Sequence, residues 1–147
     1  AFDRSLELLQ LDYVDMYMIH WPTPFDWRSG ETWKAFAKLR EDGRVRTLGV
    51  CNFMPEHLDR LYEETGEYPT VNQIELHPTW QQRDVVEYCH AHDIAVEAYS
   101  PMARGADLAN GVIERGAWCD PCAGDFALAY RERHDHHPQV RAYRAPA

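Results

Sequence analysis

Short apolar runs alternate with segments of helical periodicity over the first hundred residues, and this alternation restricts the fold more than any other feature. The strand-like runs, rich in aliphatic and aromatic side chains, cover residues 13–19, 45–50, 70–76 and 94–99. Helical patterns fill the intervals over residues 31–42, 55–65 and 82–92, and residues 1–12 resemble the end of one more helix. Because parallel strands need a crossover, which is usually a helix, this order predicts parallel β-α-β units.

Four parallel strands with covering helices fit either an open doubly wound sheet or part of a (β/α)8 barrel. An open sheet that binds phosphate usually has a G-x-G-x-x-G turn after its first strand, and this chain has none. A whole barrel typically needs about 250 residues, whereas the chain has 147. We therefore predict an α/β fold, a partial (β/α)8 TIM barrel over residues 1–114.

The composition changes abruptly after Glu114. Residues 115–147 contain seven Ala and five Arg but one Leu, one Val and no Ile, so they cannot supply another buried strand. We expect a divergent, irregular tail with one short helix at most, over residues 125–133. The abrupt change leads to the hypothesis of a translated frame shift.

Charge and cysteine content exclude several functional classes. With a formal net charge of −9, the chain lacks the excess of Lys and Arg that is typical of a nucleic-acid-binding protein. No apolar run is long enough to span a bilayer or to form a signal peptide, so no membrane partner is expected. Four cysteines in 147 residues agree with a reducing compartment, and we expect a cytoplasmic protein. The chain opens without Met in a helical pattern, so we also expect a preceding segment.

Polar or aromatic residues follow every predicted strand, where β/α folds place their chemistry. Each of them alone is more often a hydrogen-bonded structural residue or a helix cap, but four such strand ends together favour a site. Asn52 and Gln73 carry amide donors and acceptors that suit a carboxamide, and Tyr99 offers a flat face to a ring. Ser100 and the backbone amides toward Gly105 suit a phosphate.

Four segments resemble, in order and spacing, strands four to seven of the aldo-keto reductases. They are residues 11–22 (LDYVDMYMIHWP), 43–53 (GRVRTLGVCNF), 71–78 (VNQIELHP) and 98–105 (AYSPMARG). The resemblance covers residues 1 to about 114 and is strongest to the microbial, diketogluconate-reductase-like branch. It implies a barrel that binds NADPH without a Rossmann domain and transfers hydride to a small aldehyde or ketone.

The resemblance also implies a role for individual residues. His20 matches the catalytic histidine that orients and polarises the substrate carbonyl, and Trp21 matches an aromatic wall beside the substrate. The implied cofactor-binding residues are Cys51, Asn52, Gln73, Tyr99, Ser100, Met102 and Gly105. Cys51 stands where the family usually has Ser, which replaces a hydroxyl with a weak thiol donor.

Other family residues have no counterpart in the sequence. The resemblance assigns the catalytic tyrosine, and the aspartate and lysine that lower its pKa, to strands two and three, which lie upstream of Ala1. It assigns recognition of the adenosine 2′-phosphate to an eighth strand, whose pattern residues 115–147 do not show. We therefore expect an incomplete or inactive fragment of a reductase.

Several alternatives stay open. The chain is also interpretable as a non-catalytic half-barrel that self-associates through open sheet edges, or that binds only the nicotinamide end of the cofactor. Cys119 and Cys122 with the histidines at 134, 136 and 137 approach zinc-site spacing, and His20 with His77 could serve a barrel metallohydrolase; we predict neither metal site. Residues 24–28, with Phe25 and Trp27, either line an apolar pocket for the carbonyl compound or form an exposed loop that packs against its own helix, the one that follows it.

Overall fold

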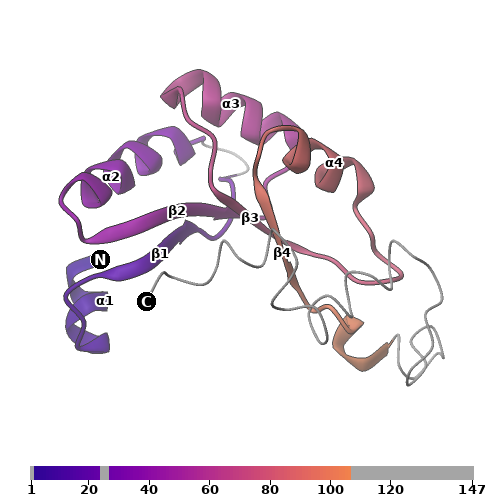
Figure 1. The fold of residues 1–147 in the computed structure, drawn as a ribbon, viewed down its shortest axis with the longest axis horizontal. Helices are drawn as coiled ribbons and strands as arrows, with labels where there is room; N and C mark the ends of the chain where they lie inside the picture. The colour runs from indigo at the N-terminus through magenta and orange to yellow at the C-terminus, as the bar shows by residue number, and fades with distance from the viewer. Residues whose placement is uncertain (1, 24–26, 107–147) are drawn as a thin grey trace. The chain divides into compact units, whose positions relative to one another are not determined.

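The computed structural model describes residues 2–23 and 27–106, which form strands that alternate with helices (Figure 1). The elements are α1 (Phe2–Leu9), β1 (Val14–Ile19), α2 (Ser29–Glu41), β2 (Val45–Cys51), α3 (Pro55–Thr65), β3 (Val71–Glu75), α4 (Arg83–Ala91), β4 (Ala95–Tyr99) and the short 3₁₀ helix η1 (Ala103–Gly105). The predicted order of strands and helices is confirmed.

The chain divides into two compact units, residues 1–72 and 73–147, and β3 begins in the first and ends in the second. In the first unit β1 and β2 pair in parallel, with Val14 opposite Val45 and Ile19 opposite Val50. The strand order in the sheet is β1-β2-β3-β4. Each strand lies beside its predecessor in the sequence, which agrees with a succession of β-α-β units.

The first unit has a core built between its strands and helices. Helix α2 packs along β1 and β2 and against α3 (Figure 1). The largest side chains with under 2% exposure here are Trp33, Leu48, Phe53, Leu58 and Leu61. Burying each such side chain stabilises the fold by roughly 1.5–3 kcal/mol, so residues of α2, β2, α3 and the β2–α3 connection supply much of this core.

Helix α3 has a clear start and stop in its sequence. Pro55 occupies the first turn, where its missing N–H costs nothing. The Met54 N–H donates a hydrogen bond to His57 Nδ1 at 3.1 Å, which satisfies a backbone donor at the helix entrance. Gly66 ends the helix at φ 74°, in the left-handed region, and its N–H donates to the Tyr62 carbonyl at 2.7 Å.

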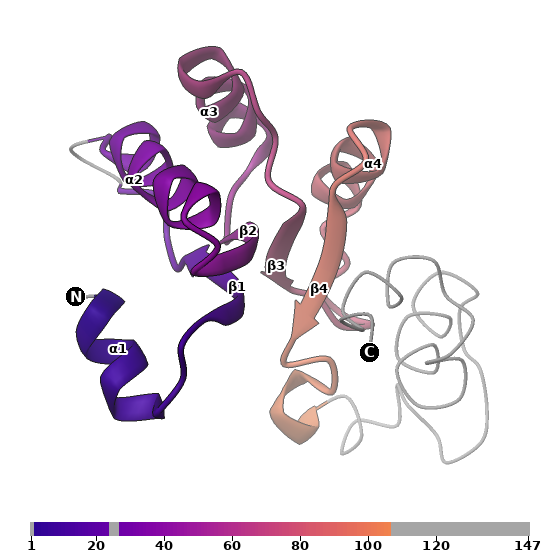
Figure 2. The same ribbon diagram turned by 60° about the vertical axis from the view of Figure 1, so that its left-hand side comes forward.

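In the second unit α4 packs on β4 (Figure 2). The buried apolar residues here are Ile74, Leu76, Val85, Cys89, Ile94, Ala95 and Val96. Along β3, buried Ile74 alternates with half-buried Gln73 and Glu75, because successive strand residues point to opposite faces. Polar side chains therefore share the face of β3 opposite Ile74.

The predicted boundary after residue 114 and the predicted tail over residues 115–147 lie outside the described residues. Within residues 2–23 and 27–106, no helix combines the length and the apolar character needed to cross a bilayer.

Candidate functional site

Two predicted site residues follow β1 directly. His20 and Trp21 are both exposed, Trp21 by 56%, and their rings meet edge to face at a centroid distance of 6.2 Å. Because Ile19 pairs with Val50 in a parallel ladder, His20 lies at the same end of the sheet as the carboxyl end of β2. The first unit thus presents an imidazole and an indole to solvent at the carboxyl ends of its strands.

Asn52 connects the ends of β1 and β2. Its Nδ2 donates a hydrogen bond to the His20 backbone carbonyl at 3.1 Å, and its side chain is half-buried. Its backbone is in the left-handed region at φ 62°, which Asn adopts more readily than most residues. Cys51, the preceding residue, is 5% exposed and belongs to the packed interior.

The second unit carries Gln73 and Tyr99 on neighbouring strands. Gln73 Nε2 donates a hydrogen bond to Glu97 Oε2 at 2.8 Å, which places Gln73 and Glu97 on the same face. Tyr99 is two residues beyond Glu97 and half-buried, so its ring belongs to that face as well. The Leu76 N–H donates to the Tyr99 carbonyl at 3.3 Å, which joins the carboxyl ends of β3 and β4.

The segment after β4 turns tightly. Ser100 has φ 52° and Gly105 has φ 91°, and Ala103 and Arg104 between them also have positive φ. The Ala103 N–H donates to the Ser100 carbonyl at 2.8 Å, and the Gly105 N–H donates to the Met102 carbonyl at 2.7 Å. Three non-glycine residues in the left-handed region mark this turn as strained.

Two polar residues near the predicted site have structural partners that the sequence did not reveal. Asn72 is wholly buried and binds the backbone of Phe53 twice: its Nδ2 donates to the carbonyl at 2.8 Å and its Oδ1 accepts from the N–H at 3.3 Å. From the sequence, no role was assigned to Glu97, the partner of Gln73. Its only signal in the sequence is a charge inside an apolar strand.

The histidine at the exit of β3 has local partners. His77 Nδ1 lies 3.0 Å from Thr79 Oγ1, and its Nε2 lies 3.9 Å from Glu75 Oε1. Among the residues that the structure describes, no group of three or more His, Cys, Asp and Glu side chains is arranged to hold a metal ion. The cysteines and histidines of the zinc alternative, which was not predicted, lie outside the described residues.

Trp27 packs on a helix, but not on α2, the loop's own helix, which the second alternative expected. Its Nε1 donates to Glu64 Oε2 at 2.9 Å, its ring stacks on His57 at a centroid distance of 6.1 Å, and the Arg60 guanidinium lies 4.7 Å from its ring centre. The hydrogen bond from Trp27, aided by Arg60, lowers the pKa of Glu64. The helix is α3, which anchors the end of the β1–α2 loop; Phe25 is outside the described residues.

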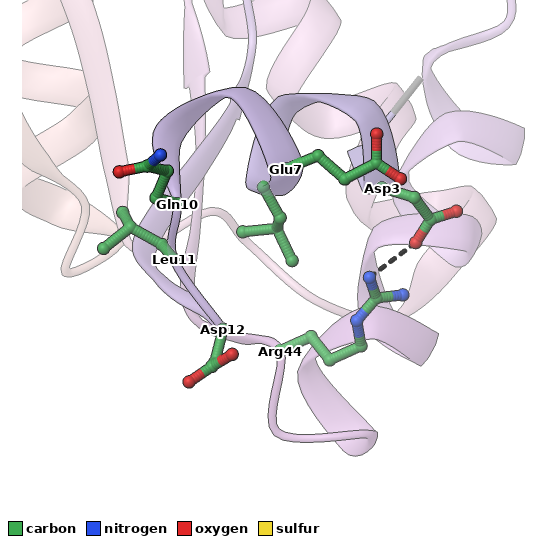
Figure 3. Close-up of a pocket in the computed structure, with 7 residues that line it drawn as sticks. Asp3, Glu7, Gln10, Leu11, Asp12 and Arg44 are labelled. Atoms are coloured by element: carbon green, nitrogen blue, oxygen red, sulfur yellow. Dashed lines mark hydrogen bonds and ion pairs between the residues drawn. The ribbon is translucent and has the colours of Figure 1, made fainter.

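A pocket of about 410 Å³ lies beside α1 in the first unit (Figure 3). It is lined by Asp3, Leu6, Glu7, Gln10, Leu11, Asp12 and Arg44. Arg44 immediately precedes β2, so the pocket lies at the opposite end of this strand from Asn52. An ion pair joins Arg44 Nη2 to Asp3 Oδ1, and this hydrogen-bonded partner lowers the pKa of Asp3.

Comparison with known proteins identifies close relatives over most of the chain. An aldo-keto reductase of Mycolicibacterium smegmatis is 51% identical over 113 residues, which are 77% of this chain and 41% of that protein. The methylglyoxal reductase DkgA of Yersinia pestis is 51% identical over 105 residues, 71% of this chain and 38% of that protein. The chain thus spans about two fifths of the length of these curated relatives.

A solved structure has the same fold over the same part of the chain. The crystal structure of a Gox0644 mutant in complex with NADPH matches with a TM-score of 0.71 and 44% identity, covering 74% of this chain and 40% of that one. This likeness confirms the predicted partial barrel of parallel strands and alternating helices. The model of the aldo/keto reductase family matches residues 1–115, most of the chain. The chain belongs to the aldo/keto reductase family.

Proposed function

We propose that this chain carries the nicotinamide-holding part of an NADPH-dependent oxidoreductase that reduces a small aldehyde or ketone to an alcohol. The observation that supports the proposal most is that each unit, taken by itself, carries an amide and an aromatic side chain on or directly after its strands, with an imidazole beside them in the first unit. A relative that is 51% identical is a methylglyoxal reductase, which favours a small carbonyl substrate.

In the first unit, His20 and Trp21 are the proposed substrate-facing residues. An exposed imidazole donates a hydrogen bond from its N–H, and such a bond to a carbonyl oxygen orients and polarises the carbonyl. The indole of Trp21 beside it excludes water from one side of a small substrate. The hydrogen bond from Asn52 to the His20 carbonyl fixes the backbone from which the imidazole projects.

The residues of the second unit suit the nicotinamide end of the cofactor. Gln73 offers amide hydrogen bonds to a carboxamide, and the half-buried Tyr99 ring offers a surface for a stacked heterocycle. The tight turn from Ser100 through Met102 to Gly105 brings backbone close to the strand end, where a phosphate contact is proposed. When bound, NADPH supplies the hydride, and these side chains hold and orient its ring.

The chain alone is expected to bind the cofactor without efficient turnover. The family resemblance assigns proton donation to a tyrosine that has no counterpart among these residues, and general acid catalysis typically contributes about 10²–10⁴-fold. We also propose a cytoplasmic location, because four cysteines in 147 residues agree with a reducing compartment.

Titration of the full 147-residue chain with NADPH, followed by cofactor fluorescence, tests the proposal. We expect saturable binding that Tyr99→Ala weakens about tenfold, since base–aromatic stacking is worth roughly 1–3 kcal/mol. Tyr99→Phe keeps the ring and is expected to bind like the original chain. Tyr62→Ala on α3 is the matched control, because it removes a 45%-exposed ring that stacks on Tyr68.

Two results contradict the proposal. The first is absence of NADPH binding by a chain that melts cooperatively, and the second is an equal loss of affinity in Tyr99→Ala and Tyr62→Ala.

A second candidate function, a self-associating half-barrel, is favoured by the surface of the first unit. Leu8, Leu9 and Leu11 are 67%, 59% and 51% exposed, although they are large apolar residues. Neighbouring apolar side chains in contact with water favour association. The oligomeric state of the purified chain tests this candidate.

A further inference from the structure

Glu97 is a charged residue within the apolar run of β4, and its carboxylate has a specific partner. Glu97 Oε2 accepts a hydrogen bond from Gln73 Nε2 at 2.8 Å, between two half-buried side chains on neighbouring strands. We infer that Glu97 is a positioning residue that fixes the amide of Gln73 with its oxygen directed toward the cofactor carboxamide. The inference rests on the function proposed above.

The chemistry of the two groups determines the orientation. The nitrogen and oxygen of a Gln amide are nearly equal in size, so packing alone does not distinguish the two orientations. A carboxylate ion only accepts hydrogen bonds, so it selects the orientation in which Nε2 faces it. In the reversed orientation, Gln73 Oε1 would face the carboxylate oxygen, and two acceptors would repel each other.

The setting strengthens this selection. A hydrogen bond to a charged acceptor is roughly twice as strong as one between neutral groups. Partial burial of Gln73 and Glu97 raises the cost of leaving the amide nitrogen without its acceptor.

The fixed orientation has a consequence for ligand recognition. With Nε2 bonded to Glu97, the remaining polar atom of the Gln73 amide is Oε1, which accepts hydrogen bonds. Because Oε1 has two lone pairs, it can accept a hydrogen bond from a ligand even when another protein group also donates to it. The NH₂ group of a nicotinamide carboxamide is such a donor, whereas an acetyl group at the same ring position has none. Glu97 thereby makes the site selective for a carboxamide.

The experiment compares two cofactors on the full chain: NADPH and the reduced 3-acetylpyridine analogue of NADPH, which lacks the NH₂ donor. Fluorescence titration gives both dissociation constants. For the original chain we expect NADPH to bind about fivefold more tightly, the value of one hydrogen bond of about 1 kcal/mol. The amide that Glu97→Gln introduces can accept or donate, so it allows both orientations of the Gln73 amide. The ratio of the two dissociation constants should therefore fall toward one.

Glu87→Gln provides the matched control, because it makes the same chemical change at an exposed position on α4. This variant should keep the fivefold ratio of the original chain. Thermal melting of all three proteins shows whether either substitution acts through stability.

The outcomes separate the two proposals. Binding of NADPH with an unchanged ratio in Glu97→Gln overturns the positioning role and leaves the proposed function standing. An equal loss of affinity for both cofactors, together with a lower melting temperature, shows a merely structural pair and also overturns the positioning role. No NADPH binding by the original chain overturns the proposed function and, with it, the role of Glu97.

Discussion

Asn52 and Ser100 directly follow β2 and β4 and share an unusual backbone conformation, with φ of 62° and 52°. Left-handed conformations cost an L-residue roughly 1–2 kcal/mol, less for Asn, and they persist where the surrounding structure determines them. The sequence predicted both residues as site candidates from their place after strands. It did not predict their conformation, which depends on contacts such as the bond from Asn52 to the His20 carbonyl.

Two substitutions at Asn52 separate its backbone role from its side-chain role. Asn52→Gly removes the hydrogen bond to His20 but keeps φ 62° accessible, whereas Asn52→Ala removes the bond and strains the backbone. We expect Asn52→Ala to be less stable than Asn52→Gly by about 1 kcal/mol, measured by urea unfolding. Equal stabilities would show that the conformation of residue 52 carries no cost.

The neighbours Asn72 and Gln73 show where prediction from residue type ends. Both are amides on one predicted strand, and successive strand residues face opposite sides. Asn72 faces inward and binds the Phe53 backbone, whereas Gln73 faces Glu97, a residue 24 positions further along the chain. Such a distant partner leaves no mark in local spacing, so Glu97 could not be assigned from the sequence.

At the scale of elements, α2 is tied to the segment after α3 by a charged pair. Arg40 Nη1 and Nη2 lie 2.5 and 3.0 Å from Glu67 Oε1 and Oε2, and Trp33 Nε1 donates to Glu67 Oε2 at 3.4 Å. The hydrogen bonds from Arg40 hold the pKa of Glu67 below its usual value of 4.5, and the same pairing raises the pKa of Arg40. The pair thus stabilises this packing only while Glu67 is ionised.

The pH dependence of stability follows from this direction. A carboxyl whose pKa is lowered by folding stabilises the fold above its unfolded pKa, near 4.5, and loses that contribution as the pH falls through the folded value. We expect Glu67→Gln to be less stable than the original chain at pH 7, with a difference that shrinks below pH 4.5. Urea unfolding at several pH values measures it.

The control for Glu67 is Glu63→Gln, at an exposed position of α3. This substitution should leave the difference from the original chain small at every pH. A Glu67→Gln difference that stays constant down to pH 3 would contradict the account.

The elements themselves were predictable because their ends carry local signals. Pro55 and Gly66 bound α3, and Gly43 follows α2. The start of α2 at Ser29 was less evident, since no side chain caps it. Instead, the Arg28 N–H donates to Thr23 Oγ1 at 2.9 Å in the preceding loop.

At the scale of the whole molecule, the exposed leucines Leu8, Leu9 and Leu11 allow a test of whether the chain self-associates. If this surface mediates association, the chain elutes as a dimer or larger species in size-exclusion chromatography with light scattering. We expect the double variant Leu8→Glu and Leu11→Glu to shift this species to monomer, because both residues are more than half exposed and their replacement disturbs little packing. A monomeric original chain would contradict the self-association candidate.

Features that join distant parts of the chain were beyond prediction from sequence. The pocket beside α1 depends on the pair of Asp3 and Arg44, and the anchor of the β1–α2 loop depends on the contact of Trp27 with Glu64. Four ordered motifs predicted the fold class, since their order and spacing reflect the succession of strands and helices. Their side-chain partners depend on packing that local patterns do not encode.

The central claim is that the strand ends of this chain hold the nicotinamide end of NADPH. The side-chain amide NH₂ groups of Asn52 and Gln73 report on it directly in a ¹H–¹⁵N NMR titration of the full chain with NADPH. If the proposal holds, these two resonances and the backbone amides of residues 99, 100 and 102–105 shift together in a saturable manner. Shifts that gather at Asp3, Glu7 and Arg44 around the pocket beside α1, with Asn52 and Gln73 unchanged, would contradict it.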